Sequence, residues 1–138
     1  MPRRLAITGP FQVDVIPYEE TPLQSHQVLV QTELASGKHG TTMALFDNGA
    51  FGGQRFDTNL RLFIDDPSAT PNQPTPDAPW NMGTTGLGMV IAVGDAVTRW
   101  QVGDRVFGIM DIRETNICDE NRLWPLGEID PLLALCVE

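Results

Sequence analysis

Residues 86–94 read Gly-Leu-Gly-Met-Val-Ile-Ala-Val-Gly, and residues 102–108 read Val-Gly-Asp-Arg-Val-Phe-Gly. The first stretch is apolar throughout, which predicts a strand covered on both faces. The second predicts a turn that leads into another strand. In that turn Asp104 is expected to bind backbone amides and Arg105 to pair with a nearby acid, both structural roles. Short apolar strands bounded by glycines favour a mostly β fold.

Alternating apolar residues on either side of these stretches predict further strands. The three segments nearest the N-terminus, 4–8, 11–16 and 27–35, are expected to form an antiparallel meander. Residues 60–64 are a further strand candidate, and residues 116–118 are expected to pair at a sheet edge. Residues 123–126 are expected to be extended, because Pro125 restricts the residue before it.

One short helix and one long loop interrupt the strands. Thr41 or Thr42 is expected to cap a helix that runs to Asp47 and is closed by Asn48-Gly49. Residues 65–79 hold five prolines and almost no large apolar side chain. They predict a surface loop or lid that carries no core of its own.

The C-terminal residues predict the start of a second helix. Asp130 stands at the N-cap position and Pro131 at the first helical position, where its missing N–H costs nothing. Residues 132–137 are apolar on every side, and such a short helix must be covered to be stable. It either docks on the body of the domain or continues into chain beyond this sequence; we favour the second.

Composition limits the class of protein. The 138 residues amount to about one domain, and 18 acidic against 9 basic side chains give a net charge of −9. This charge argues against nucleic acid as a partner. No apolar run approaches the ~20 residues that cross a bilayer, and the N-terminus lacks a secretory signal, so we expect a soluble, cytoplasmic chain with no membrane partner. Cys118 and Cys136 are expected to be buried thiols, and His26 a solvated side chain.

Several of these pieces together resemble the N-terminal GroES-like catalytic domain of the medium-chain dehydrogenase/reductase superfamily, which includes the alcohol dehydrogenases. Gly-Asp-Arg-Val at 103–106, after a strand with two glycines, is the most specific of them. The resemblance implies one GroES-like domain over residues 1–138, a partly open β-barrel with short helices and a C-terminal helix start. The other matching pieces are residues 26–31, 35–42, 86–97, 123–127 and 130–132.

Members of that superfamily hold a nicotinamide cofactor on a following Rossmann domain, with the substrate in the cleft between the domains. The resemblance therefore implies that this chain alone binds no cofactor, and that NAD(P) binds only together with a Rossmann domain, which these 138 residues lack. Residues 83–88, Gly-Thr-Thr-Gly-Leu-Gly, precede a strand and do not join a strand to a helix, so a phosphate site is not expected there. Their glycines are expected to permit close approach of backbone.

The resemblance also bears on metal. Zinc-dependent members carry a Cys in the site loop and a His-Glu pair before the core strand; here these positions hold His39, Thr84 and Thr85. A catalytic zinc needs three N, S or O ligands from the protein, and threonine hydroxyls are poor ligands. The resemblance is therefore closest to the zinc-independent branch, and no zinc is expected.

Five residues form the expected site. The imidazole of His39 is expected to move a proton to or from a substrate oxygen; the alternative is a surface-turn histidine. Thr41 stands where zinc-dependent relatives keep a proton-relaying hydroxyl; the alternative is a helix cap. Thr42, Thr84 and Thr85 are expected to line the substrate cleft, with a hydroxyl bonded to local backbone as the alternative for Thr84.

Three hypotheses about function follow. The first is the substrate-side domain of a zinc-independent NAD(P)-dependent oxidoreductase, inactive alone, that acts on a small carbonyl, alcohol or activated double bond. The second is a stand-alone GroES-like binding or assembly module, with residues 65–79 docking a partner and the apolar tail forming a homo-oligomer interface. The third is a split enzyme whose Rossmann domain is a separate polypeptide.

Overall fold

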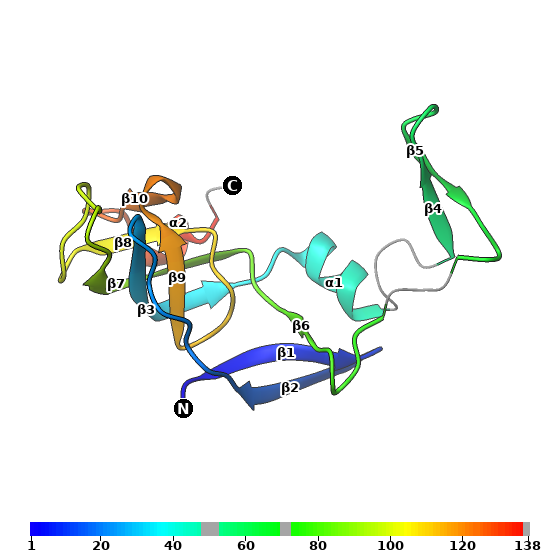
Figure 1. The fold of residues 1–138 in the computed structure, drawn as a ribbon, viewed down its shortest axis with the longest axis horizontal. Helices are drawn as coiled ribbons and strands as arrows, with labels where there is room; N and C mark the ends of the chain where they lie inside the picture. The colour runs from blue at the N-terminus through cyan, green and yellow to red at the C-terminus, as the bar shows by residue number, and fades with distance from the viewer. Residues whose placement is uncertain (48–52, 70–72, 137–138) are drawn as a thin grey trace.

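A computed structural model of the chain describes residues 1–47, 53–69 and 73–136, and strands dominate this part of the chain (Figure 1). A five-stranded sheet has the order β10-β8-β7-β3-β9, and a three-stranded sheet has the order β2-β1-β6. A separate hairpin pairs β4 with β5. The strands are β1 (Arg3–Gly9), β2 (Gln12–Pro17), β3 (Gln27–Ser36), β4 (Gln54–Asp57), β5 (Leu62–Asp65), β6 (Trp80–Asn81), β7 (Thr85–Val93), β8 (Arg105–Gly108), β9 (Thr115–Asp119) and β10 (Leu123–Pro125). The helices are α1 (His39–Asp47), the 3-10 turn η1 (Glu120–Arg122) and α2 (Pro131–Ala134).

The sheets do not close on one another, which matches the expected mostly β, partly open barrel. The predicted strands at 86–94 and 102–108 are confirmed as β7 and β8, which pair antiparallel. The expected edge strand at 116–118 is confirmed within β9, and the extended segment at 123–126 contains β10. The core between these strands is apolar and contains the buried side chains of Val28, Val30, Val90, Val106, Met110, Cys118 and Leu123.

The prediction that the central strand is covered on both faces is wrong for its second half. Every residue from Thr85 to Gly88 is buried, but beyond Gly88 the side chains alternate. Met89 and Ile91 are each 40% exposed. The barrel thus encloses one face of β7 here and leaves the other face open, as an antiparallel sheet allows.

The expected meander of the first three strands is also wrong. β1 and β2 do form an antiparallel hairpin, but β3 pairs with β7 and β9 in the other sheet. The connection after β2 leads the chain to the five-stranded sheet. It contacts that sheet at Tyr18, whose hydroxyl donates to the carbonyl of Thr115 in β9 over 3.0 Å. The guanidinium of Arg113 also lies 3.9 Å from the centre of the Tyr18 ring.

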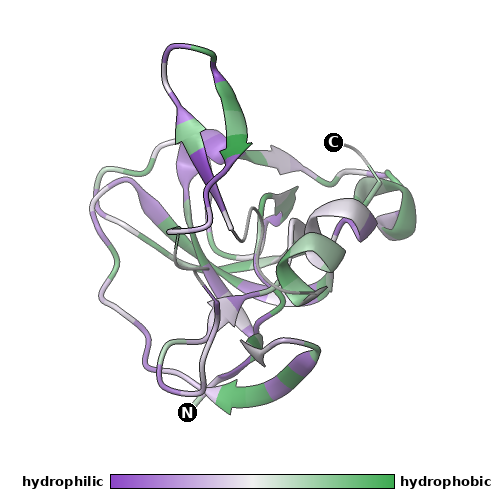
Figure 2. Cartoon of the chain, turned by 90° about the vertical axis from the view of Figure 1, so that its right-hand side faces the viewer, coloured by the Kyte–Doolittle hydropathy of each residue, from purple (hydrophilic) through white to green (hydrophobic). Residues whose placement is uncertain are grey.

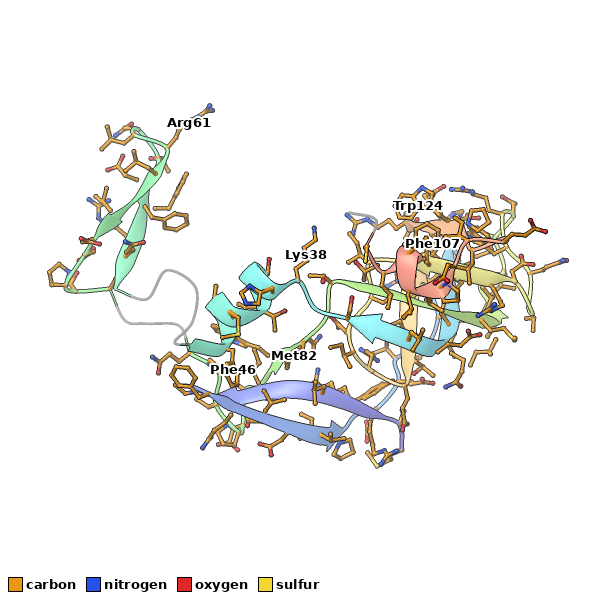
Figure 3. All side chains as sticks on the ribbon, turned by 180° about the vertical axis from the view of Figure 1, so that it is seen from behind. Lys38, Phe46, Arg61, Met82, Phe107 and Trp124 are labelled. Atoms are coloured by element: carbon orange, nitrogen blue, oxygen red, sulfur yellow. The ribbon has the colours of Figure 1, made fainter. Side chains whose placement is uncertain are left out.

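Helix α1 begins earlier than expected. The carbonyl of Lys38 accepts the N–H of Thr42 over 2.8 Å, so Lys38 holds the N-cap position, and the expected caps Thr41 and Thr42 lie inside the helix. Where the helix ends, Phe46 packs edge-on against Phe11 of the β1–β2 turn (Figure 3). The expected stop at Asn48-Gly49 lies outside the described residues.

The β4–β5 hairpin projects away from the barrel (Figures 1 and 2), and β4 has no counterpart among the expected strands. The strand expected at 60–64 begins only at Leu62, because Asp57 accepts the N–H groups of Asn59 and Leu60 and so holds residues 58–61 in a turn. Phe56 and Phe63 pack edge-to-face across the two strands with their ring centres 5.2 Å apart. In the expected loop 65–79, where residues 70–72 are not described, Thr75 and Ala78 form an isolated bridge.

At the C-terminus the expected cap of α2 is confirmed: Asp130 accepts the N–H of Leu132 over 2.8 Å. Ala134 is fully buried against Leu87, Phe107 and Leu126, whereas Leu132 is 67% exposed. Helix α2 therefore docks on the barrel through one side, the first of the two expected arrangements, and presents leucine on the other. Whether the helix continues into further chain stays a prediction. Residues 137 and 138 lie outside the described part. In the part of the chain that is described, no helix is long and apolar enough to cross a membrane.

The two cysteines differ in environment, so the expectation that both are buried is wrong for Cys136. That residue is exposed, two positions beyond the buried Ala134 and on the other side of the helical turn. Burial raises the pKa of the Cys118 thiol to about 11, and the thiolate is the reactive form.

A disulfide reagent at mildly alkaline pH is expected to modify about one thiol per folded chain. Cys136→Ser should abolish this reaction and Cys118→Ser should preserve it; two rapidly labelled thiols in the folded chain would contradict the account.

Candidate functional site

Two segments far apart in the sequence meet where the site was expected. One, at residues 36–42, runs from the last residue of β3 into the first turn of α1 and is called the site loop below. The other, at residues 83–85, leads into β7. Ser36 and Thr85 are partners in the β3–β7 ladder. The N–H of Thr84 donates to the Ser36 carbonyl over 2.9 Å, and its hydroxyl accepts the N–H of Lys38 over 2.9 Å. The two segments that carry the expected site residues therefore meet.

His39 is the first residue of α1, and its side chain is exposed. Thr41 is also exposed and stands two residues further along. Residues two apart on a helix point about 200° apart, so the two side chains do not face each other. An exposed imidazole at this position can exchange a proton with a small molecule over the loop, independently of Thr41.

Thr42 and Thr85 are less accessible. The Thr42 hydroxyl lies against Gly37, where any Cβ would clash with it, and the residue is half-buried. Thr85 is only 2% exposed. Among the five expected site residues, His39 and Thr41 are therefore the exposed ones.

The residues at the expected zinc positions do not suit that metal. A catalytic zinc takes three N, S or O ligands. The Thr84 hydroxyl is engaged by the backbone of Ser36 and Lys38, and Thr85 is buried, which leaves the His39 imidazole as the one good ligand of the three. Over residues 1–47, 53–69 and 73–136, no group of three or more His, Cys, Asp or Glu side chains is placed to hold a metal ion.

The glycines at 83–88 do not fit a cofactor phosphate either. Gly83 has a φ of +127°, and a Cβ there would lie 2.6 Å from the Ile112 nitrogen and 2.7 Å from the Met110 carbonyl oxygen. A Cβ on Gly86 would lie 2.7 Å from that of Met110. The expected role of these glycines, close approach of backbone, is confirmed, and the space beside them is filled by the protein.

Other polar residues are structural, as expected. Asp104 accepts the N–H of Gln101 over 2.9 Å, and Arg105 forms an ion pair with Glu33. His26 is largely exposed, but its Nδ1 lies 3.1 Å from Glu120. The backbone N–H groups of residues 98 and 99 bind Glu120 and lower the pKa of its carboxyl, and His26 adds to this effect.

A groove of about 450 Å³ lies between β1 and β3 and begins at Ala35, next to the site loop. No local sequence pattern indicates it, since its lining comes from four separate segments: residues 3–5, 15, 32–35 and 112–114. Arg3 on its rim pairs with Glu114 over 2.8 Å. The rest of the lining mixes charged with apolar side chains, namely Arg4, Leu5, Val15, Thr32, Glu33, Leu34, Ile112 and Arg113.

Comparison with known proteins gives a family match over most of the chain. The family model described as the alcohol dehydrogenase GroES-like domain matches residues 24–127. No curated protein matches the chain.

Solved structures share the fold at low sequence identity. The CurF ER cyclopropanase from the curacin A biosynthetic pathway is 20% identical with a TM-score of 0.68, and the match covers 99% of this chain and 39% of that one. The CurK enoyl reductase is 17% identical with a TM-score of 0.71, over 99% of this chain and 39% of that one. A quinone oxidoreductase of Pseudomonas syringae pv. Tomato DC3000 is 22% identical with a TM-score of 0.64, over 98% and 37%. The present chain thus spans about two fifths of the length of these structures.

Proposed function

The chain belongs to the alcohol dehydrogenase GroES-like domain family, and from this we propose that it is the substrate-side domain of a zinc-independent, NAD(P)-dependent oxidoreductase of the medium-chain dehydrogenase/reductase superfamily. The observation that carries the proposal is the family match over residues 24–127, within which the loop at 36–42 and residues 83–85 meet. The names of two similar structures, an enoyl reductase and a quinone oxidoreductase, support a reductase. The poor zinc ligands at Thr84 and Thr85 support the zinc-independent branch.

The proposed chemistry divides between two domains. A nicotinamide cofactor, held by a Rossmann domain, supplies or takes the hydride. When a small-molecule carbonyl or activated double bond is reduced, one atom receives the hydride and another needs a proton. In this proposal the His39 imidazole, which is exposed at the start of α1, gives that proton and takes it back when an alcohol is oxidised. Thr41 offers a second hydroxyl, and the half-buried Thr42 and Thr84 line the proposed cleft. The buried Thr85 supports them from the start of β7.

The partner in this proposal is a Rossmann-type domain, either elsewhere in a longer polypeptide or on a separate chain. The exposed leucines of α2, Leu132 and Leu133, offer an apolar surface for that domain or for a second copy of this chain. Figure 2 shows α2 as one of the most hydrophobic segments of the molecule. The composition suits a cytoplasmic enzyme.

A second function has one observation in its favour. The β4–β5 hairpin exposes Phe56, Leu60, Leu62 and Phe63, although Asp57 and Arg55 fix its shape through hydrogen bonds and an ion pair. A preformed apolar arm of this kind suits a binding or assembly module without catalysis.

Titration with a simple ketone, cyclohexanone, followed by amide NMR separates the two functions. For the substrate-side domain, the largest shifts are expected at residues 38–42 and 84, with His39→Gln reducing them and Phe56→Ala leaving them unchanged. Shifts confined to the β4–β5 hairpin, or no saturable shifts at residues 38–42, would contradict the proposed function.

A further inference from the structure

We propose that Thr84 is a positioning residue: its hydroxyl accepts the N–H of Lys38, the N-cap residue of α1, and this contact, here called the cap, fixes the start of the helix and thereby His39. The importance of His39 rests on the proposed function, but the cap itself does not. This assigns Thr84 a role different from the substrate contact expected from the sequence.

The start of α1 is poorly fixed by its own residues. Its first helical hydrogen bond runs from the Thr42 N–H to the Lys38 carbonyl, which places Lys38 at the N-cap. Ser, Thr, Asp and Asn are favoured there because their side chains accept a backbone N–H, whereas a lysine side chain has no acceptor atom. Gly37 and Gly40 stand on either side, and glycine adds conformational freedom. The first turn of the helix therefore needs an anchor from elsewhere in the fold.

Thr84 supplies that anchor with three hydrogen bonds across 46 to 48 positions of sequence. Its Oγ1 accepts the Lys38 N–H over 2.9 Å and donates to the Ser36 carbonyl over 3.3 Å. Its own N–H donates to the same carbonyl over 2.9 Å. These contacts hold the backbone on both sides of Gly37.

The residues around Thr84 form the rigid side of this contact. Thr85 is buried and pairs with Ser36 in the sheet, and the backbone at Gly83 packs against Met110 and Ile112. Figure 3 shows Lys38 between the end of β3 and the first turn of α1. A fixed strand entrance thus holds an otherwise loosely determined helix start.

The hydrogen bonds also determine what Thr84 does not do. A threonine hydroxyl donates one hydrogen bond, and here the Ser36 carbonyl takes it. Thr84 therefore has no proton to offer a substrate oxygen in this geometry. Its contribution reaches the substrate through the position of His39, the residue directly after Lys38.

Hydrogen exchange and NMR of the 138-residue chain test the cap with three variants. Thr84→Val removes the hydroxyl with little change of shape, Thr84→Ser keeps it, and Thr75→Val is the matched control. In the control, Thr75 Oγ1 accepts the Ala78 N–H over 3.1 Å in a turn outside the site. Thr84→Val is expected to speed exchange of the Lys38 and Thr42 amides by roughly tenfold, to shift the His39 ring signals and to remove the cyclohexanone-induced shift at His39. Thr84→Ser should retain wild-type behaviour, and Thr75→Val should affect only the Ala78 region.

Unchanged Lys38 exchange and unchanged His39 signals in Thr84→Val would overturn the proposal. So would a Thr84→Ser chain that loses the cap as fully as Thr84→Val does. If Thr84→Val unfolds the whole chain, Thr84→Ala is judged by the same amides. The exchange measurement uses neither substrate nor cofactor, so its failure is distinct from failure of the proposed function, which the ketone titration of the wild-type chain decides.

Discussion

Gly88→Ala is expected to cost at least about 3 kcal/mol of folding free energy, at or beyond the upper end for overpacked sites. A Cβ at position 88 would overlap the carbonyl oxygen of Gln31 and lie 2.8 Å from its carbonyl carbon. Both atoms belong to the backbone of β3, which pairs with β7 along its whole length. No side-chain rotation relieves this clash, so the two central strands must separate.

Gly40→Ala is the matched control for this substitution. Gly40 lies in α1, and a Cβ there would meet no heavy atom within 4 Å beyond its chain neighbours and the backbone of its own helix. It is not among the residues with positive φ. Alanine there is expected to raise stability by up to about 1 kcal/mol, because it is the better helix former. Urea unfolding of the two variants measures both effects, and a loss below about 1 kcal/mol for Gly88→Ala, the low end for overpacking, would contradict the close pairing of β3 with β7.

Leu87→Ala is expected to destabilise the chain by about 2–5 kcal/mol. Leu87 is fully buried in the cluster that joins the barrel to α2, together with Phe107, Leu126 and Ala134. Truncation leaves a cavity between these side chains and removes their contacts. Since natural domains are stable by about 5–15 kcal/mol in total, the variant should show a much lower urea midpoint.

Leu132→Ala provides the comparison, since Leu132 lies in α2 but is 67% exposed. Its effect is expected to stay within about 0.5 kcal/mol, as for other surface sites. Equal losses in both leucine variants would mean that α2 is covered on the side that the structure leaves exposed.

The barrel strands could be predicted because their signals are local. Glycines mark the ends of β1, β7 and β8, and apolar residues fill these strands. The turn before β8, Gly-Asp-Arg, has a composition typical of turns. The caps at Asp130 and Asp104 were equally readable, since each side chain binds an amide within a few residues.

Pairing between distant strands could not be read in the same way. β3 resembles the next strand of a meander, but it pairs with β7 and β9, which are distant in sequence. The connection before it is held against β9 by contacts of Tyr18 and Glu20 with Thr115. The short strand β4, Gln-Arg-Phe-Asp, has one apolar residue in four, which is too little for a period-two pattern. Its existence depends on pairing with β5 and on the turn that Asp57 organises.

For the candidate site, the sequence indicated two segments that do meet in the structure, but not the contacts between them. The resemblance to a known family indicated both the loop with His39 and the pair Thr84 and Thr85. The hydrogen bond between Lys38 and Thr84 spans 46 positions, and no spacing rule anticipates it. The helix start at His39 was missed because it depends on this distant hydroxyl and not on a local cap.

Calorimetric titration of the chain with NADPH and with NADH tests the central claim most directly. If the chain is the substrate-side part of an oxidoreductase, neither cofactor should give saturable heat up to about 1 mM. The cofactor is then held by the Rossmann domain, and the glycines at 83–88 pack against other residues of the chain and leave no room for a phosphate there. Saturable binding of either cofactor to the chain alone, with a Kd of about 10 µM or below, would contradict the account.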